Sequence, residues 1–258
     1  MLKAQRVGTW DTLPIAAMDA KDSAVAGLRA QGLTPKAIAR RLGMRPAEVS
    51  AIIQANAARA AAAFDTLPPL VDCFLSPGWS AGLGLEANAC AWRDFDPAPD
   101  RGRGLMAVLV SRKGRYGKVS ATGYLVDAYC LGVKDAFGPR NMEEQRYREL
   151  LPQFFAAFNG ERVLAPIELA QTLVYGAVEY ARQLGFQPSP DFAVAAPHLG
   201  GFAGPARITF GDHGRPNYVS GPHDDAERVV ATLRRTVGDG SFDCTILGGP
   251  GTRLSALH

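Results

Sequence analysis

Residues 32–50 read GLTPKAIARRLGMRPAEVS, and this stretch predicts two helices joined by a glycine turn. Thr34 is a good N-cap and Pro35 a good first helical residue, so we expect a helix from Pro35 onward. Gly43 suits a left-handed turn, where a Cβ atom would be strained. Pro46 can then open a second helix at its first position. The stretch therefore predicts a helix, a tight turn and another helix.

The spacing of three residues in this stretch indicates how the two helices pack. Ala39 is a small residue at the point where the helices cross, and Gly43 forms the turn between them. Val49 packs the second helix back onto the first. Residues 22–60 resemble the helix-turn-helix superfamily on this spacing. The resemblance implies that the second helix enters the major groove of DNA and that the protein binds paired half-sites as a dimer. No heptad in the sequence demonstrates a dimer.

The side chains expected to face double-stranded DNA fall into two groups. On the second helix, Arg45 suits a guanine or a phosphate, and Gln54 suits an adenine. The cations of the first helix suit the phosphate backbone, which positions the protein without reading sequence. Arg45 stands where the motif often has Ser or Thr, which either weakens the helix start or serves DNA. The full set is Lys36, Arg40, Arg41, Arg45, Glu48, Ser50 and Gln54.

The positive charge of the chain is concentrated in the same region. The whole chain has a net charge of +3, but residues 1–64 hold nine Lys or Arg and four Asp or Glu, a net charge of +5. The other 194 residues carry a net charge of −2. A small basic module attached to a weakly acidic body is suited to phosphate contacts.

The helical pattern extends on both sides of this motif. One more helix is expected before these two, over residues 22–31. The helix that begins at Pro46 is expected to continue through the alanine-rich residues 54–63, because alanine has the highest helix propensity. Leu67-Pro68-Pro69 ends that pattern. We therefore expect an all-α module at residues 1–66 and a second domain at residues 67–258.

The second domain has the pattern of an α+β fold with a mostly antiparallel sheet. Buried strands are expected at residues 105–110 and 118–129, paired with each other. The remaining expected elements are helices at 142–158, 166–184 and 225–237, strands at 206–211 and 216–220 around a hairpin turn at 212–215, and a final strand at 242–247.

Residues 123–137 contain the first candidate site of the second domain. Cys130 could be a nucleophile whose pKa is lowered by Lys134, and Asp127 and Asp135 could hold a divalent metal. A structural interpretation stays open beside these, in which Asp127 caps backbone groups and Cys130 is buried.

Residues 210–225 contain the second candidate site, with His223, Asp224 and Asp225 at a helix start. Carboxylates favour that position through the helix dipole, so an N-cap also explains the two acids. The two blocks together resemble a group of bacterial proteins of unassigned function. An enzyme would require the blocks to converge within about 3 Å of one reacting position.

Composition and motifs exclude several classes of protein. Cys73, Cys90, Cys130 and Cys244 form no Cys-x-x-Cys pair, which argues against a zinc site and a disulfide framework. A phosphate loop, a nucleophile elbow and a His-Glu-x-x-His motif are absent, so no cofactor or metal is expected. The sequence also lacks a membrane-spanning run and a signal peptide, so we expect a cytoplasmic protein without membrane contact.

These observations favour a bacterial DNA-binding protein, either a transcriptional regulator or a DNA-associated factor. Its second domain would form a homodimer, sense a ligand or bind a partner, without catalysis. One alternative is an enzyme that acts on nucleic acid or a nucleotide through Asp127, Cys130, Lys134, Asp135, His223 and Asp224. The other is a protein-interaction adaptor whose helical module never contacts DNA.

Overall fold

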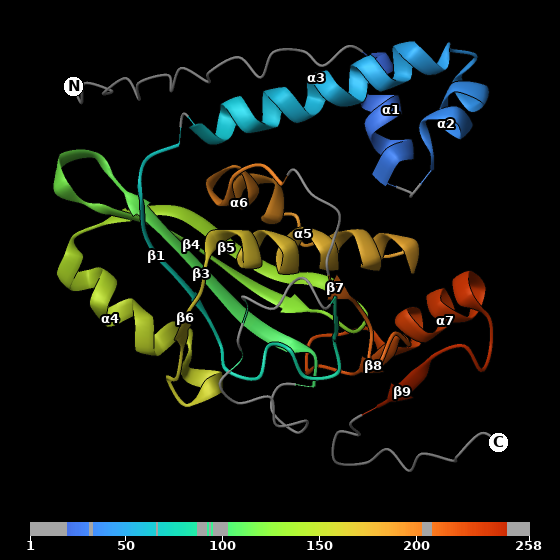
Figure 1. Cartoon of the computed structure of the whole chain (residues 1–258). Coiled ribbons are helices and arrows are strands. Elements are labelled where there is room, and N and C mark those ends of the chain that lie inside the picture. Colours follow the sequence, from blue (N-terminus) through green and yellow to red (C-terminus); the bar gives the residue numbers. More distant parts are fainter. Residues whose placement is uncertain are drawn as a thin grey trace, which may run out of the picture. The chain divides into compact units, whose positions relative to one another are not determined.

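The chain has an α+β fold, as the sequence predicts (Figure 1). The computed structural model describes residues 20–30, 33–65, 67–86, 92, 94, 103–202 and 208–246. Contacts divide the chain into two compact units, residues 1–58 and 59–258. A long helix crosses this division and ends at Asp65, next to the domain boundary expected at residue 66. No helix among the described residues combines the length and the apolar character needed to cross a membrane.

The smaller unit contains three helices around a small apolar cluster. They are α1 (Ala20–Ala30), α2 (Pro35–Leu42) and α3 (Pro46–Asp65). Val25, Ile38, Ala39 and Val49 are buried in this cluster, so one or two residues from each helix form its centre. The residues expected to pack the two helices against each other, Ala39 and Val49, are 2% and 0% exposed.

Both ends of α2 have the predicted local structure. The Thr34 hydroxyl accepts the N–H of Ala37 at 3.3 Å, which caps the start of the helix. Gly43 ends the helix with φ 64° and ψ 30°, and an added Cβ atom would meet nothing within 4 Å. The backbone conformation, rather than lack of space, therefore favours glycine at this turn.

The larger unit is built on a five-stranded antiparallel sheet. The strand order is β5-β4-β3-β1-β6, and the strands are β1 (Leu70–Leu75), β3 (Leu105–Lys113), β4 (Val119–Asp127), β5 (Gly132–Met142) and β6 (Val163–Leu164). The expected pairing of the two central strands is confirmed, because β3 and β4 pair without a break from Leu105–Asp127 to Lys113–Val119.

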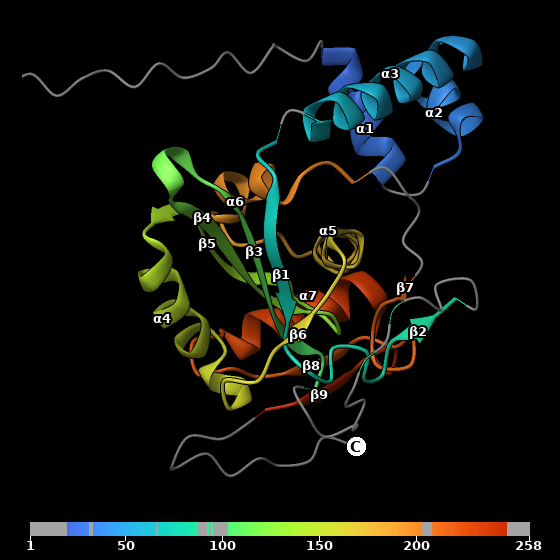
Figure 2. The same ribbon diagram turned by 60° about the vertical axis from the view of Figure 1, so that its left-hand side comes forward.

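Helices cover both faces of this sheet, as Figure 2 shows. One face carries α5 (Ile167–Gln183) and α6 (Phe192–Leu199), and the opposite face carries α4 (Glu144–Phe154), which is followed by a short 3₁₀ turn. The central strands β3 and β4 are buried along most of their length. This explains why residues 105–110 of β3 form a continuous apolar run rather than an alternating pattern.

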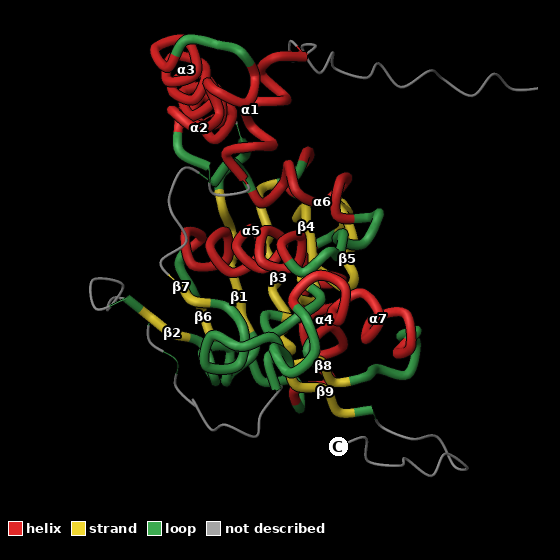
Figure 3. Tube along the Cα trace, turned by 90° about the vertical axis from the view of Figure 1, so that its right-hand side faces the viewer, coloured by secondary structure: helices red, strands yellow, loops and turns green. Residues whose placement is uncertain are grey.

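A smaller group of elements lies at one end of the unit (Figure 3). It comprises β8 (Asn217–Val219), α7 (Ala226–Val237) and β9 (Asp243–Thr245), with Cys130, Leu184, Tyr218 and Leu233 buried between this group and the rest of the unit. A separate pair joins β2 (Gly84–Leu85) to β7 (Ile208–Thr209). Asp225 caps α7 by accepting the N–H of Arg228, in agreement with the sequence.

Several expectations for the larger unit were wrong or incomplete. The hairpin expected at residues 206–220 reduces to a bridge between Asp212 and Arg215, because β7 pairs with β2 and β8 pairs in parallel with β9. Residues 132–142 form the edge strand β5, where no strand was expected. The short helix α6 was not expected. The ends of the expected hairpin and of the final strand, residues 206–207 and 247, lie outside the described residues.

Candidate functional site

The expected DNA-contacting cations lie at the surface of the smaller unit. Lys36, Arg40, Arg41 and Arg45 are exposed, and so is Gln54, whereas Glu48 and Ser50 are half-buried. Among the residues that the structure describes, no carboxylate lies within ion-pair distance of Lys36, Arg40 or Arg41. Three cations on one short helix therefore lack a counter-charge in this part of the chain.

Two of these cations border a hollow between α2 and the start of α3. The hollow has a volume of about 420 Å³. Lys36 and Arg40 both line it, because residues four apart lie on the same face of a helix. The other lining residues are Thr34, Ala37, Ala39, Met44 and Pro46. This arrangement can hold an anionic group between two side chains of α2.

The start of α3 is capped although Arg45 stands where Ser or Thr is usual. Glu48 accepts the backbone N–H of Arg45 at 3.0 Å and pairs with its guanidinium group at 2.8 Å. The hydrogen bond from Arg45 holds the pKa of Glu48 below its usual value. Glu48 therefore supplies half of a capping box, and the helix start is satisfied without Ser or Thr at the cap.

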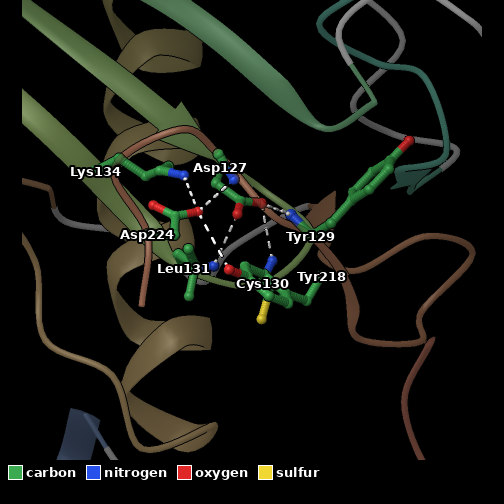
Figure 4. A network of polar contacts seen from close by, with 8 residues as sticks. Asp127, Tyr129, Cys130, Leu131, Lys134, Tyr218 and Asp224 are labelled. Atoms are coloured by element: carbon green, nitrogen blue, oxygen red, sulfur yellow. Dashed lines mark hydrogen bonds and ion pairs between the residues drawn. The ribbon is translucent and has the colours of Figure 1, made fainter. Parts of the chain in front are cut away.

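The larger unit contains a polar cluster built on the turn between β4 and β5 (Figure 4). Asp127 is 8% exposed and accepts the backbone N–H groups of Tyr129, Cys130 and Leu131 at 2.9, 3.0 and 3.2 Å. Burial raises the pKa of Asp127 to about 6, although these hydrogen bonds and Lys134 act in the opposite direction. Asp127 thus fixes the turn, which agrees with its structural interpretation.

Cys130 does not have the environment of a nucleophile. Its side chain is fully buried, and burial raises the pKa of the thiol, as does the neighbouring Asp127. Lys134 acts in the opposite direction but does not compensate. The expected lowering of this pKa is therefore wrong, because the thiol belongs to the apolar cluster between the turn, β8 and α7.

The two candidate blocks do meet, at Lys134 and Asp224. The Lys134 ammonium group lies 2.7 Å from a carboxylate oxygen of Asp224, and the two side chains are 20% and 12% exposed. Burial acts to raise the pKa of Asp224, but hydrogen bonds from Lys134 and the Gly221 N–H outweigh it, so the pKa is lowered. The Tyr218 hydroxyl donates to the same oxygen at 3.5 Å. Sequence reasoning missed Tyr218 and Gly221, although an Asp three residues after a Gly is a local sign of such a turn.

Asp135 and His223 do not join this cluster. Asp135 is exposed and accepts the N–H of the adjacent Ala136, while His223 is exposed in the turn before α7. Within the described ranges, no three His, Cys, Asp or Glu side chains are grouped so that they could hold a metal ion. The buried Asp127 uses its carboxylate oxygens on three backbone N–H groups, and a metal held by Asp127 and Asp135 stays a prediction.

A pocket of about 300 Å³ opens beside the cluster. Asp127 and Lys134 line it together with Arg103, Leu105, Asn217, Val219, Ser220 and Gly221. The free thiols of Cys73 and Cys130 are buried, that of Cys244 is exposed, and Cys90 lies outside the described residues. The cluster is best described as a support for the β4–β5 turn and the start of α7.

The position of Asp127 predicts a pH dependence of stability. Because its pKa is about 6 in the folded chain and lower in the unfolded chain, folding favours the protonated form. The contribution of Asp127 should be fully present below about pH 4 and decline by about 3 kcal/mol as pH rises through about 6. The measurement is urea unfolding of the wild type and of Asp127→Asn at several pH values. A free-energy difference between them that does not change from pH 4 to 7 would contradict this account.

Comparison with known proteins returned no relative. The chain matches no protein-family model, and no curated protein or solved structure is detectably similar to it. Any functional argument therefore depends on the residues and geometry described above.

Proposed function

We propose that this protein binds double-stranded DNA through its smaller unit. The observation that carries the proposal is the set of exposed cations on α2, which have no carboxylate partner in the described part of the chain and adjoin the turn into α3. A phosphate backbone is the commonest biological partner for such an arrangement in a helix-turn-helix.

The local geometry supports separate roles for the two helices. Lys36 and Arg40 border the same hollow, which suits a phosphate group held between them. Ser50 and Gln54 lie four residues apart on α3. The hydroxyl group of Ser50 and the amide group of Gln54 suit base edges in the major groove. Arg45 is 82% exposed at its side chain and can reach a phosphate or a guanine while it remains paired with Glu48.

The larger unit has another role in this proposal. Its buried candidate residues mainly satisfy one another and the backbone, which favours a non-catalytic body over an enzyme. We propose that it provides dimer formation, ligand sensing or partner binding for a transcriptional regulator or DNA-associated factor. A dimer would place two smaller units on paired half-sites.

The direct test removes the two cations at the hollow. In Lys36→Gln/Arg40→Gln, the affinity for a mixed-sequence duplex of about 20 base pairs should fall about 10- to 100-fold at roughly 0.1 M salt, because two phosphate contacts are lost. Both side chains are exposed, so the fold should be retained. Fluorescence anisotropy with labelled duplex measures the effect.

The matched control is Arg182→Gln/Arg235→Gln, which removes the same charge from exposed positions on α5 and α7. This variant should bind duplex DNA within about twofold of the wild type. Equal losses in the two double variants would show that net charge alone drives binding, and absence of binding by the wild type would favour a protein-interaction role for the helical unit.

A further inference from the structure

The turn between β3 and β4 is rich in cations that the proposed function does not use. Residues 112–118 read RKGRYGK, with four cations and no acid. Arg112 is turned inward and is 4% exposed, whereas Lys113 and Arg115 are exposed. The tip of the turn therefore presents positive charge on the larger unit.

Tyr116 at this tip is unusual in both exposure and backbone conformation. Its side chain is 94% exposed, and its φ of 58° and ψ of 38° lie in the left-handed region that tyrosine seldom adopts. Large aromatic side chains are normally packed against other groups. Backbone outliers of this kind concentrate at functional positions, so an exposed ring held in this way indicates a contact surface.

The base of the turn is firmly held. The Gly114 N–H donates to the Lys118 carbonyl at 2.7 Å and closes the turn, and the Lys113 N–H donates to the Pro69 carbonyl at 2.8 Å. Below them, Arg112 donates to the carbonyl oxygen of His198 at 2.8 Å. The ring of Tyr116 is therefore presented on a rigid support, which lowers the entropic cost of binding.

The charges around the tip favour an anionic partner. Lys118 pairs with Glu143 at 3.2 Å, but neither Lys113 nor Arg115 has an ion-pair partner among the described residues. A pocket of about 750 Å³ adjoins the turn and is lined by Lys113 and Lys118, with Asp72, Glu144 and Arg148 from β1 and α4.

The two acids of this pocket already have partners. Glu144 pairs with Arg148, and Asp72 accepts a hydrogen bond from the Tyr147 hydroxyl at 3.0 Å. The charge of Glu144 is thus compensated and Asp72 is hydrogen-bonded to a neutral hydroxyl, while the two cations at the tip have no ion-pair partner among the described residues. The surface combines an open aromatic face, uncompensated cations and adjacent space.

We propose that residues 113–118 bind single-stranded DNA, with Tyr116 stacked on an unpaired base and Lys113 and Arg115 on the flanking phosphates. An exposed aromatic ring between cations is the usual platform for unpaired bases. A base pair within a duplex does not offer its face to such a ring, so this contact differs from the proposed duplex contact of α2 and α3. The choice of DNA over RNA rests on the proposed function.

The test compares two substitutions of Tyr116 in the full chain. Tyr116→Asn removes the ring and tolerates the left-handed backbone, whereas Tyr116→Phe keeps the ring. Neither changes any charge. Affinity for oligo-dT of about 12 nucleotides should fall about tenfold in Tyr116→Asn and stay within about twofold of the wild type in Tyr116→Phe. Arg115→Gln should also weaken binding, while the exposed-site control Arg182→Gln should not.

Three results would overturn the proposal: no binding of oligo-dT by the wild type, equal binding by Tyr116→Asn and the wild type, or tighter binding of oligo-U than of oligo-dT. Duplex affinity of the same variants separates this proposal from the previous one. Tyr116→Asn should bind duplex DNA with wild-type affinity. Adding Tyr116→Asn to Lys36→Gln/Arg40→Gln should lower the affinity for oligo-dT as much as it does in the wild type. If the wild type binds oligo-dT but not duplex DNA, only the proposed role of the helical unit is contradicted.

Discussion

Replacing Arg112 by alanine should lower the free energy of unfolding of the larger unit by about 3–5 kcal/mol. The guanidinium group of Arg112 lies on β3 and donates to the carbonyl oxygens of Pro68, His198 and Leu199 at 2.9, 2.8 and 3.4 Å. It therefore joins the central sheet to the end of α6 and to the segment before β1. Its removal would leave the buried carbonyl group of His198 without this donor, which costs more than the loss of a surface hydrogen bond, while the carbonyl group of Leu199 would keep the Gln171 amide at 3.1 Å.

Urea unfolding followed by tryptophan fluorescence measures this effect, since Trp79 is buried in the core of the larger unit. Arg182→Ala, which removes an exposed arginine from the same unit, should change stability by less than about 0.5 kcal/mol. Arg112→Lys should recover little of the loss, because an ammonium group cannot reproduce the planar fork. Similar stabilities of Arg112→Ala and Arg182→Ala would show that these hydrogen bonds do not hold α6 on the sheet.

Placing a charge at Val49 should abolish duplex binding while leaving the larger unit folded. Val49 is fully buried, and among the described residues Val25, Ile38 and Ala39 share the centre of its cluster. Burial of an unpaired carboxylate in Val49→Asp costs several kcal/mol. A cluster of this size cannot offset that cost, so the fraction of molecules with a folded helical unit should fall. The apparent affinity for duplex DNA should fall with it, by at least about 100-fold.

Val49→Ala provides the graded comparison, because it keeps the site apolar and should reduce affinity much less. Anisotropy gives the duplex affinity, and the urea transition of the larger unit should coincide in the wild type and both variants. Wild-type affinity in Val49→Asp would mean that duplex binding does not require the packed helical unit.

Local signals explain which parts of the fold were predictable. Thr34 and Gly43 act on their own neighbours, through a cap and a left-handed turn, so both ends of α2 follow directly from the residue types. The central strands were also predictable, because burial on both faces requires a continuous apolar run such as residues 105–110.

Elements defined by distant partners were not predictable in the same way. Residues 132–142 include glycine, proline and several charged residues, and they become a strand only through pairing with β4. Turn chemistry at residues 212–215 was recognised, but β8 pairs with β9, which follows it beyond an intervening helix. The apolar residues 192–199 were too few to distinguish a helix from other buried segments.

The candidate sites show the same division. Asp127 accepts N–H groups two to four residues further along the chain, so its structural interpretation was available from the sequence. Lys134 and Asp224 are 90 residues apart, and only the folded sheet and the turn before α7 bring them together. The high exposure of Tyr116 likewise depends on the way β3 and β4 project their connecting turn.

Duplex affinity as a function of salt concentration tests the central claim most directly. If the cations of α2 and Arg45 neutralise three or four phosphates, log affinity should fall with log salt with a slope between about −3 and −4. The slope should become shallower by about 2 in Lys36→Gln/Arg40→Gln and stay unchanged in Arg182→Gln/Arg235→Gln. Absence of binding at low salt, or one slope for all three proteins, would contradict the assignment of DNA binding to the helical unit.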